Sequence, residues 1–296
     1  MDDIGPGGTQ SIGRAIGLLL EVSRAGSGGA RLSDLVVSAD LPKATVRRLL
    51  LALVHADLLE QDETTRRYHI GPEIYVLGTI ASKRFGIHAI AQDSLTRLSR
   101  MTGDTAFLSV PRGTYSVCLH REEGNFPIRT HVLQAGDRHP LGLGAGSLAL
   151  LAAMPDPDIE KIIESNQAIV SEKYPNYSPA KLRELVQMTR KDGYALNPGM
   201  IMQGSWGIGA AVRGHDGKPA GALSIAAVEM RLQENRRKEL VPLLQEEAAR
   251  LELLLKHAGV TSGRPMDVSA DHKSPSRNLK RLPRNPSKRV LVEGDG

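Results

Sequence analysis

The sequence predicts an α+β protein built from two units, and three observations support this prediction. The chain has 296 residues, a length that suits two domains of ordinary size better than one. Apolar residues recur at helical spacing through most of the first 86 residues. Beyond residue 87, strand-length apolar runs follow one another and helical patterns gather at both ends, which favours a largely antiparallel sheet.

Composition excludes several classes of protein. Apolar residues make up 41% of the chain and the net charge is only +5, so its bulk is not intrinsically disordered. A single cysteine, Cys118, rules out a disulfide framework and a cysteine-based zinc or iron–sulfur site. No apolar run reaches the roughly 18 residues of a membrane-spanning helix, and the acidic N-terminus shows no secretory signal. We therefore expect a cytoplasmic protein that uses no cofactor or metal and does not contact a membrane.

Three helices are expected to open the first unit. Helical spacing of apolar residues extends over 10–25, and the glycine-rich run 26–29 ends this helix. A short second helix begins near Leu32 and stops before Pro42. Proline lacks the backbone N–H that the first position of a helix leaves unpaired, so Pro42 suits the first position of a third helix.

The third helix, over 43–55, carries the most informative pattern. Its apolar residues recur at i, i+3, i+4 and i+7 and form an inward stripe of Val46, Leu49, Leu50 and Leu53. Its outward N-terminal half mixes small and cationic side chains, namely Lys43, Ala44, Thr45, Arg47 and Arg48. A helix that enters a DNA major groove needs small side chains for close approach and cations for guanine edges and phosphates.

A hairpin should follow the third helix. Two short runs, 58–62 and 67–70, flank a polar turn and place Arg66 and Arg67 at its tip. Helix, short helix, tight turn, cationic helix and basic hairpin, in this order, predict a winged helix-turn-helix. A small α/β unit whose arginines are merely solvated is the alternative that the pattern leaves open.

The second unit is expected to alternate strands and helices after a linker helix that ends near residue 86. Strands are predicted over 105–110, 116–121, 128–133, 206–212 and 220–227. Helices are predicted over 87–102, 145–154, 158–165, 179–191 and 233–257. The last segment, 259–296, is rich in Lys, Arg and Pro and poor in apolar residues, which predicts a disordered basic tail.

Catalytic motifs are not found in the sequence. The glycine-rich run 142–147 matches neither the dinucleotide fingerprint nor the P-loop, and no nucleophile elbow surrounds Ser147 or Ser205. His131 and His139 lack metal-ligand neighbours, so we expect no enzyme. The glycine-rich run precedes a predicted helix start, where backbone N–H groups could bind an anion. Tight packing of the turn explains the glycines equally well.

Three strings resemble the IclR-type bacterial transcriptional regulators. Residues 41–50, LPKATVRRLL, resemble the family's recognition helix, residues 10–15 its first-helix opening, and residues 67–72 its wing strand and exit. The resemblance runs from about residue 9 to residue 258. It implies a winged helix-turn-helix DNA-binding domain over 9–71, a linker helix over 72–86, and a GAF-like effector-binding and oligomerisation domain over 87–258.

The resemblance also implies a function, a DNA-binding transcriptional regulator whose operator affinity is controlled by a small-molecule effector. It would act as a homodimer or a dimer of dimers. Contacts to double-stranded operator DNA are expected from Lys43, Ala44, Thr45, Arg47, Arg48, Arg66 and Arg67. The effector pocket is expected at Gly146, Ser147, Asn197, Gly207 and Ser224. Trp206 would either stack on the ligand or belong to the core.

The predicted pocket departs from the family pattern. Members that bind small oxo-acids often carry a carboxylate at the position of Asn197, a cysteine at that of Gly207 and a serine at that of Ala226. The resulting loss of polar groups and gain of room favour a larger organic acid, such as an aromatic one. A rival hypothesis is a small-molecule-binding enzyme or sensor whose N-terminal module only mediates association. RNA binding is disfavoured because aromatic residues, which stack on bases, make up only 3% of the chain.

Overall fold

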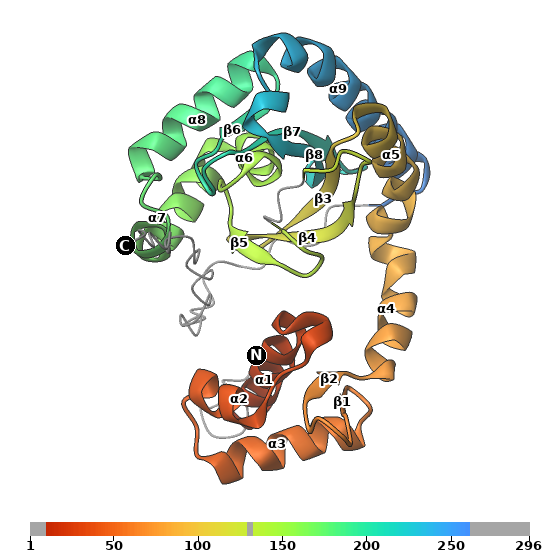
Figure 1. Cartoon of the computed structure of the whole chain (residues 1–296), viewed down its shortest axis with the longest axis vertical. Coiled ribbons are helices and arrows are strands. Elements are labelled where there is room, and N and C mark those ends of the chain that lie inside the picture. Colours follow the sequence, from red (N-terminus) through yellow and green to blue (C-terminus); the bar gives the residue numbers. More distant parts are fainter. Residues whose placement is uncertain (1–9, 129–132, 261–296) are drawn as a thin grey trace, which may run out of the picture.

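The computed structural model describes residues 10–128 and 133–260. The predicted tail over 259–296 lies almost wholly outside the described residues, as does His131. The fold class predicted from the sequence, α+β with an N-terminal winged helix-turn-helix, is confirmed. Figure 1 shows the two units, with the helix–hairpin unit below and the sheet-containing unit above.

The N-terminal unit packs three helices against a small hairpin. Its elements are α1 (Gln10–Arg24), η1 (Gly26–Gly28), α2 (Leu32–Ala39), α3 (Lys43–His55), β1 (Leu59–Gln61) and β2 (Tyr68–Ile70). The two strands pair antiparallel, and Ala30 forms an additional bridge to Tyr68. Apolar side chains of all three helices and of the hairpin form its core, namely Leu18, Val22, Leu35, Val46, Leu50, Leu53, Leu59 and Tyr68.

Helix α3 spans the predicted residues 43–55, but Pro42 precedes its first turn instead of occupying its first position. Pro42 is the N-cap residue and has an extended ψ of 137°, so the helix itself begins at Lys43. The ring of Pro42 still fits, because the N-cap residue does not need to donate a hydrogen bond within the helix.

Helix α4 (Pro72–Phe85) connects the two units, and α5 (Ile87–Thr102) follows it after Gly86. Figure 1 shows α4 crossing from the hairpin to the sheet-containing unit. Residues 75–82 are exposed along this helix, and they include the apolar side chains of Tyr75, Val76, Leu77 and Ile80.

The second unit is built on a six-stranded antiparallel sheet, counted over the described residues, with the order β5-β4-β3-β8-β7-β6. The strands are β3 (Thr105–Arg112), β4 (Tyr115–Glu122), β5 (Arg138–Pro140), β6 (Ala195–Pro198), β7 (Ser205–Arg213) and β8 (Pro219–Val228). The short edge strands β5 and β6 were not predicted. The strand predicted over 128–133 lies mostly outside the described residues, and Ile128 is not in a strand.

Helices cover both faces of this sheet. One face carries α5, the turn η2 (Glu229–Arg231) and α9 (Glu234–His257), whose apolar residues form one core cluster. The other face carries α6 (Ala145–Ala152), α7 (Asp156–Lys173) and α8 (Pro179–Asp192), which form a second cluster. The Oγ of Ser178 accepts a hydrogen bond from the backbone N–H of Lys181 and caps α8.

Two buried carboxylates hold α9 and the preceding turn η2 against the rest of the unit. Glu247 on α9 accepts hydrogen bonds of 2.7 and 2.8 Å from the guanidinium of Arg97 on α5. Asp104, the residue before β3, accepts hydrogen bonds from Arg231 at 2.7 Å and from Arg236 at 3.0 Å. The pKa of Glu247 is lowered, chiefly by the hydrogen bond from Arg97.

Candidate DNA-binding surface and effector pocket

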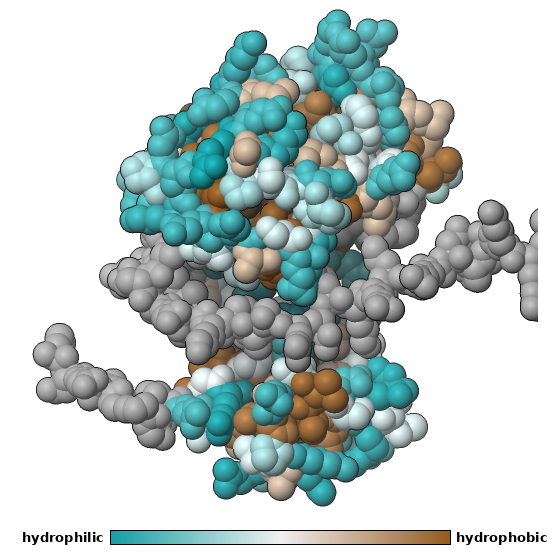
Figure 2. All heavy atoms as spheres, turned by 90° about the vertical axis from the view of Figure 1, so that its left-hand side faces the viewer, coloured by the Kyte–Doolittle hydropathy of each residue, from teal (hydrophilic) through white to brown (hydrophobic). Residues whose placement is uncertain are grey.

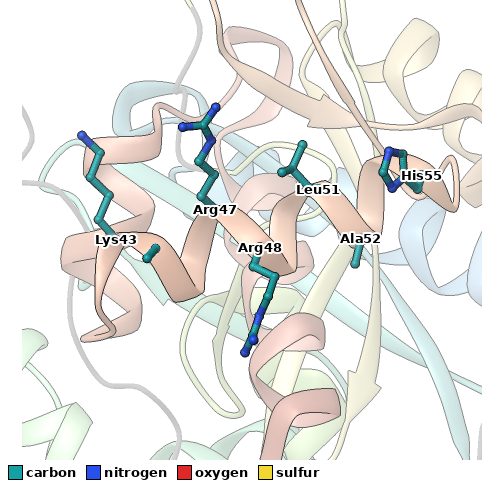
Figure 3. Close-up of a pocket in the computed structure, with 7 residues that line it drawn as sticks. Lys43, Arg47, Arg48, Leu51, Ala52 and His55 are labelled. Carbon is teal, nitrogen blue, oxygen red and sulfur yellow. The ribbon is translucent and has the colours of Figure 1, made fainter.

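The outward face of α3 is a shallow pocket lined only by side chains of this helix. Val46 and Leu50 are fully buried beneath it, as the predicted stripe requires. The lining residues are Lys43, Ala44, Arg47, Arg48, Leu51, Ala52 and His55. Figure 3 shows Arg47 and Arg48 leaving the helix in different directions. Because the two side chains point in different directions, their guanidinium groups widen the cationic face of α3.

The cations of this face are not neutralised by the chain's own carboxylates. Lys43, Arg47 and Arg48 are exposed, and no carboxylate of residues 10–128 or 133–260 forms an ion pair with any of them. Ala44 is also exposed, whereas Thr45 is half-buried. The face can thus present positive charge and a flat methyl surface to a large anionic partner.

The hairpin tip is held by Asp62. Its Oδ1 accepts hydrogen bonds from the backbone N–H groups of Thr64 and Thr65, and the bonds from Thr65 lower the pKa of Asp62. Arg66 is exposed beside this turn with a φ of 56°, a left-handed conformation that non-glycine residues adopt rarely. The turn therefore fixes the position from which the Arg66 side chain extends.

Arg67 has a structural role that the sequence did not indicate. One guanidinium nitrogen, Nη1, donates hydrogen bonds to the carbonyl oxygens of Gly28 at 2.8 Å and Gly29 at 3.0 Å. The side chain is half-buried and ties the hairpin to the turn after α1. A DNA contact by Arg67 stays a prediction, and it would have to come from the nitrogens that these bonds leave free.

The second candidate site lies where α6 meets the sheet. A Cβ added to Gly209 would lie 2.5 Å from the carbonyl oxygen of Ala145, so this helix start rests directly on β7. A Cβ on Gly146 would lie 3.0 Å from the Oγ of Ser224 and 3.5 Å from the Oγ of Ser109. Such close approach requires small residues on both surfaces.

The sheet register brings three predicted pocket residues together. Asn197 pairs with Gly207, and Gly207 pairs with Ala226, so these residues form a row across β6, β7 and β8. Ser224 lies two residues from Ala226 on β8, opposite Gly209 and on the same face of the sheet. All of these positions face α6, because the alternate residues of the same strands, such as Ile208 and Ile225, belong to the cluster on the opposite face.

Two serine hydroxyls in this site lack partners. Ser224 is 8% exposed and Ser109 is 1% exposed, yet neither hydroxyl hydrogen-bonds to another residue of the described chain. Neither oxygen is among the fully buried unpaired atoms of the described residues, so each keeps a small accessible surface that a polar molecule can reach. A polar ligand atom at the N-terminal end of α6 would satisfy both groups.

Two of the predicted pocket residues make other contacts. The Oγ of Ser147 accepts a hydrogen bond of 3.0 Å from the backbone N–H of Gly142, so it stabilises the glycine-rich turn. Trp206 packs with the cluster on the α5 and α9 face, where the guanidinium of Arg237 lies 5.6 Å from its ring centre. This placement of Trp206 favours the core alternative over ligand stacking.

Ser109 and Tyr177 were not predicted for this site. Strand alternation could have indicated Ser109, because it lies two residues after Phe107 on β3 and pairs opposite Ala222. Tyr177 lies in the connection between α7 and α8. Its hydroxyl hydrogen-bonds to Asn197, which is 20 residues further along the chain. No local sequence pattern signals that contact.

Cys118 and His139 are buried side chains of the second unit, and burial makes both unsuited to catalysis. Burial raises the pKa of the Cys118 thiol to about 12, which keeps it protonated and unreactive. Burial lowers the pKa of His139 to about 4, so its imidazole is neutral. No group of three or more His, Cys, Asp or Glu side chains in the described parts could hold a metal ion. None of the helices described is both long and apolar enough to cross a bilayer.

Comparison with protein families gives two matches that together span both units. Residues 11–63 match the model described as the IclR helix-turn-helix domain. Residues 79–253, more than half of the chain, match the model of the bacterial transcriptional regulator IclR C-terminal domain. The first match contains the cationic face of α3, and the second contains the site under α6.

Individual proteins of similar sequence are DNA-binding regulators by name. A probable HTH-type transcriptional regulator, ArcR of Halobacterium salinarum, is 28% identical over 225 residues, which cover 75% of this chain and 85% of that protein. The HTH-type transcriptional repressor AllR of Escherichia coli is 27% identical over 232 residues, covering 77% and 84%.

Solved structures share the fold at lower identity. An IclR transcriptional regulator from Silicibacter sp. TM1040 superposes with a TM-score of 0.71 at 23% identity, covering 86% of this chain and 98% of that one. An IclR homolog from Microbacterium hydrocarbonoxydans, complexed with 4-hydroxybenzoate, gives a TM-score of 0.70 at 21% identity, covering 84% and 100%.

Proposed function

Because the chain belongs to the IclR family of bacterial transcriptional regulators, we propose that α3 and the hairpin read an operator and that an organic acid under α6 controls this binding. The protein is a DNA-binding regulator with an effector-binding domain. The observation that carries the operator part is the unpaired cationic face of Lys43, Arg47 and Arg48.

Within this proposal, the small residues of α3 allow close approach and its arginines supply base or phosphate contacts. Ala44 lies beside Arg48 on the outward face, so the helix can enter a major groove along this side. Arg66, at the hairpin tip, would hold the flanking phosphates. Phosphate contacts set position and affinity, whereas contacts of Arg47 or Arg48 with guanine would set sequence preference.

A homodimer is the proposed DNA-binding form. One such module buries too little DNA surface for a specific site, so two half-sites and two copies are expected. The exposed apolar side chains of α4 are the proposed contact surface, since Tyr75 is 80% and Ile80 64% exposed. Ile12 and Ile16 of α1 add exposed apolar area, and Figure 2 shows brown apolar spheres on the N-terminal unit.

The proposed effector is an organic acid with an apolar or aromatic body. The unpaired hydroxyls of Ser109 and Ser224, with the N-terminal N–H groups of α6, suit a carboxylate. Gly207 and Ala226 place no polar side chain beside Asn197, which suits the apolar body of such an acid. The bound 4-hydroxybenzoate of the Microbacterium homolog supports the same ligand class.

Control would act through the relative placement of the two DNA-binding units. The effector favours one placement by its differential affinity for the two arrangements, and α4 transmits the difference because it joins the effector domain to the hairpin. We infer that the protein acts in the cytoplasm, where operator DNA is found, and that it performs no catalysis.

The experiment that tests the operator and effector parts together is a fluorescence anisotropy titration. An operator fragment is first selected from genomic DNA by the purified protein. 4-Hydroxybenzoate is expected to change the operator Kd, whereas 4-hydroxybenzamide, which lacks the negative charge, is not. Turnover of an acid without any effect on DNA binding would instead favour an enzyme or sensor whose N-terminal unit only mediates association.

A matched pair of variants locates the effector. Ser224→Ala removes an unpaired hydroxyl that faces α6 and should weaken the response to the acid several-fold. Ser116→Ala removes another buried, unpaired hydroxyl, on β4, and should leave the response unchanged. Equal responses of both variants would exclude the site under α6.

A further inference from the structure

The hydroxyl of Tyr177 bridges the glycine-rich turn and the predicted pocket. The backbone N–H of Gly144 donates to this hydroxyl at 3.3 Å, and the hydroxyl donates to the Oδ1 of Asn197, also at 3.3 Å. Gly144 is the N-cap residue of α6, with a φ of 78°. The hydroxyl therefore lies at the positive end of the helix that rests on the sheet.

Both hydrogen bonds of the Tyr177 hydroxyl are long, since such bonds usually measure about 2.7–3.0 Å. Burial raises the pKa of Tyr177 to about 12, so the hydroxyl is neutral at every pH at which the protein is used. A neutral acceptor is a weaker partner for the N–H groups of a helix N-terminus than a carboxylate oxygen is. A carboxylate at this place would form the shorter and stronger bond with the Gly144 N–H.

A strap of chain closes over the same turn. It consists of residues 199–204 and has Gly199 and Gly204, both with positive φ, at its ends. Between them lie Met200, Ile201 and Met202, and the Cδ1 of Ile201 would lie 3.1 Å from a Cβ on Gly144. The strap thus covers the N-terminal end of α6 with apolar side chains.

The residues that hold the strap also hold Tyr177. Asn176, the preceding residue, donates from its Nδ2 to the carbonyl oxygen of Met200 at 2.9 Å. The backbone N–H of Met200 donates at 3.2 Å to the same Oδ1 of Asn197 that accepts from Tyr177. Movement of Tyr177 therefore acts on both attachments of the strap, because it shifts Asn176 and removes a hydrogen bond that holds the Asn197 side chain in place.

We infer that the Tyr177 hydroxyl is an internal stand-in for the effector's carboxylate, and that an organic acid binds by displacing it from the Gly144 N–H and releasing the strap. The unpaired hydroxyls of Ser109 and Ser224, both more than nine-tenths buried beside Gly146, are the independent sign that a polar ligand belongs there. This inference rests on the proposed function and names the residue that opposes effector binding.

The chain offers a matched pair of variants for the test. Tyr177→Phe removes the hydroxyl and keeps the ring in the core cluster of α6, α7 and α8. Tyr174→Phe removes a second tyrosine hydroxyl from the same connection, one that hydrogen-bonds to no residue in the described ranges. Isothermal titration of the full chain with 4-hydroxybenzoate is the measurement. Without competition from the hydroxyl, Tyr177→Phe should bind about five- to tenfold more tightly than the unmodified chain, and Tyr174→Phe should match the unmodified chain.

The outcomes separate this inference from the proposed function. Equal or weaker binding by Tyr177→Phe, with normal binding by the other two proteins, overturns the stand-in and leaves the effector site in place. Failure of all three proteins to bind, together with an unchanged operator Kd, overturns the proposed effector class and this inference with it. Hydrogen exchange of residues 199–204 without ligand gives a second readout. It should be faster in Tyr177→Phe than in Tyr174→Phe, and equal rates would contradict the link between the hydroxyl and the strap.

Discussion

Gly209 lies so close beneath Ala145 that the two backbones meet without an intervening side chain. A Cβ on Gly209 would lie 2.5 Å from the carbonyl oxygen and 2.6 Å from the carbonyl carbon of Ala145. This contact sets the height of α6 above the sheet and therefore brings Gly146 against Ser224. The geometry of the candidate effector site depends on it.

Gly209→Ala should consequently destabilise the protein. The added methyl meets backbone atoms that cannot rotate away, and overpacking of this kind costs about 1–3 kcal/mol of unfolding free energy. Urea unfolding followed by circular dichroism measures the change. Gly17→Ala on α1 is the control, because no atom lies within 4 Å of its Cβ position and alanine favours a helix. A stability of Gly209→Ala equal to that of the unmodified chain would contradict this close contact.

Arg48→Ala should weaken binding to a selected operator by about 1–3 kcal/mol if Arg48 reads a base. The reason is the loss of an unpaired guanidinium from the exposed face of α3. Gel-shift titration at fixed salt measures the effect, and Arg100→Ala, an exposed arginine of α5, serves as the control. Arg47→Ala is examined in parallel, and an unchanged operator affinity of both α3 variants would remove the recognition-helix assignment.

The sequence predicted the helices of the N-terminal unit well because their signals are local. The inward stripe of α3 follows from helical periodicity alone, and its end at His55 agrees with the prediction. The edge strands β5 and β6 carry three and four residues and pair on one side only. Such short segments have too few alternating positions to give a period.

The candidate effector site was only partly predictable, because its geometry depends on contacts between distant segments. The family resemblance indicated Asn197, Gly207 and Ser224, which the sheet register places on one face. It also indicated Trp206, which strand alternation places on the opposite face of β7 from Gly207 and which packs against the α5 and α9 cluster. Tyr177 reaches the site from a connection whose path no sequence rule gives.

Replacing an apolar residue of α4 by a charge should dissociate the proposed homodimer. Ile80→Asp puts a carboxylate into the exposed apolar stretch of this helix, where a second copy would otherwise cover it. Light scattering after size-exclusion chromatography measures the mass. Met230→Asp is the control because Met230 is 74% exposed but lies on η2, far along the chain from α4. A dimer that survives Ile80→Asp would place the subunit contact elsewhere.

His139 should make the protein less stable as the pH falls from about 7 to 5. Its folded-state pKa, about 4, lies below its usual value of 6.5, so the unfolded chain binds this proton first. The stabilisation is complete above pH 6.5 and is lost as the pH falls toward 4, with a loss of about 2 kcal/mol by pH 5. His139→Gln, which cannot be protonated, should lose correspondingly less stability between pH 7 and pH 5 in urea unfolding, because the carboxylates titrate equally in both proteins. His257→Gln, at an exposed site on α9, should behave as the unmodified chain. An identical pH dependence of His139→Gln and the unmodified chain would show that His139 becomes charged within the fold, in conflict with its burial on β5.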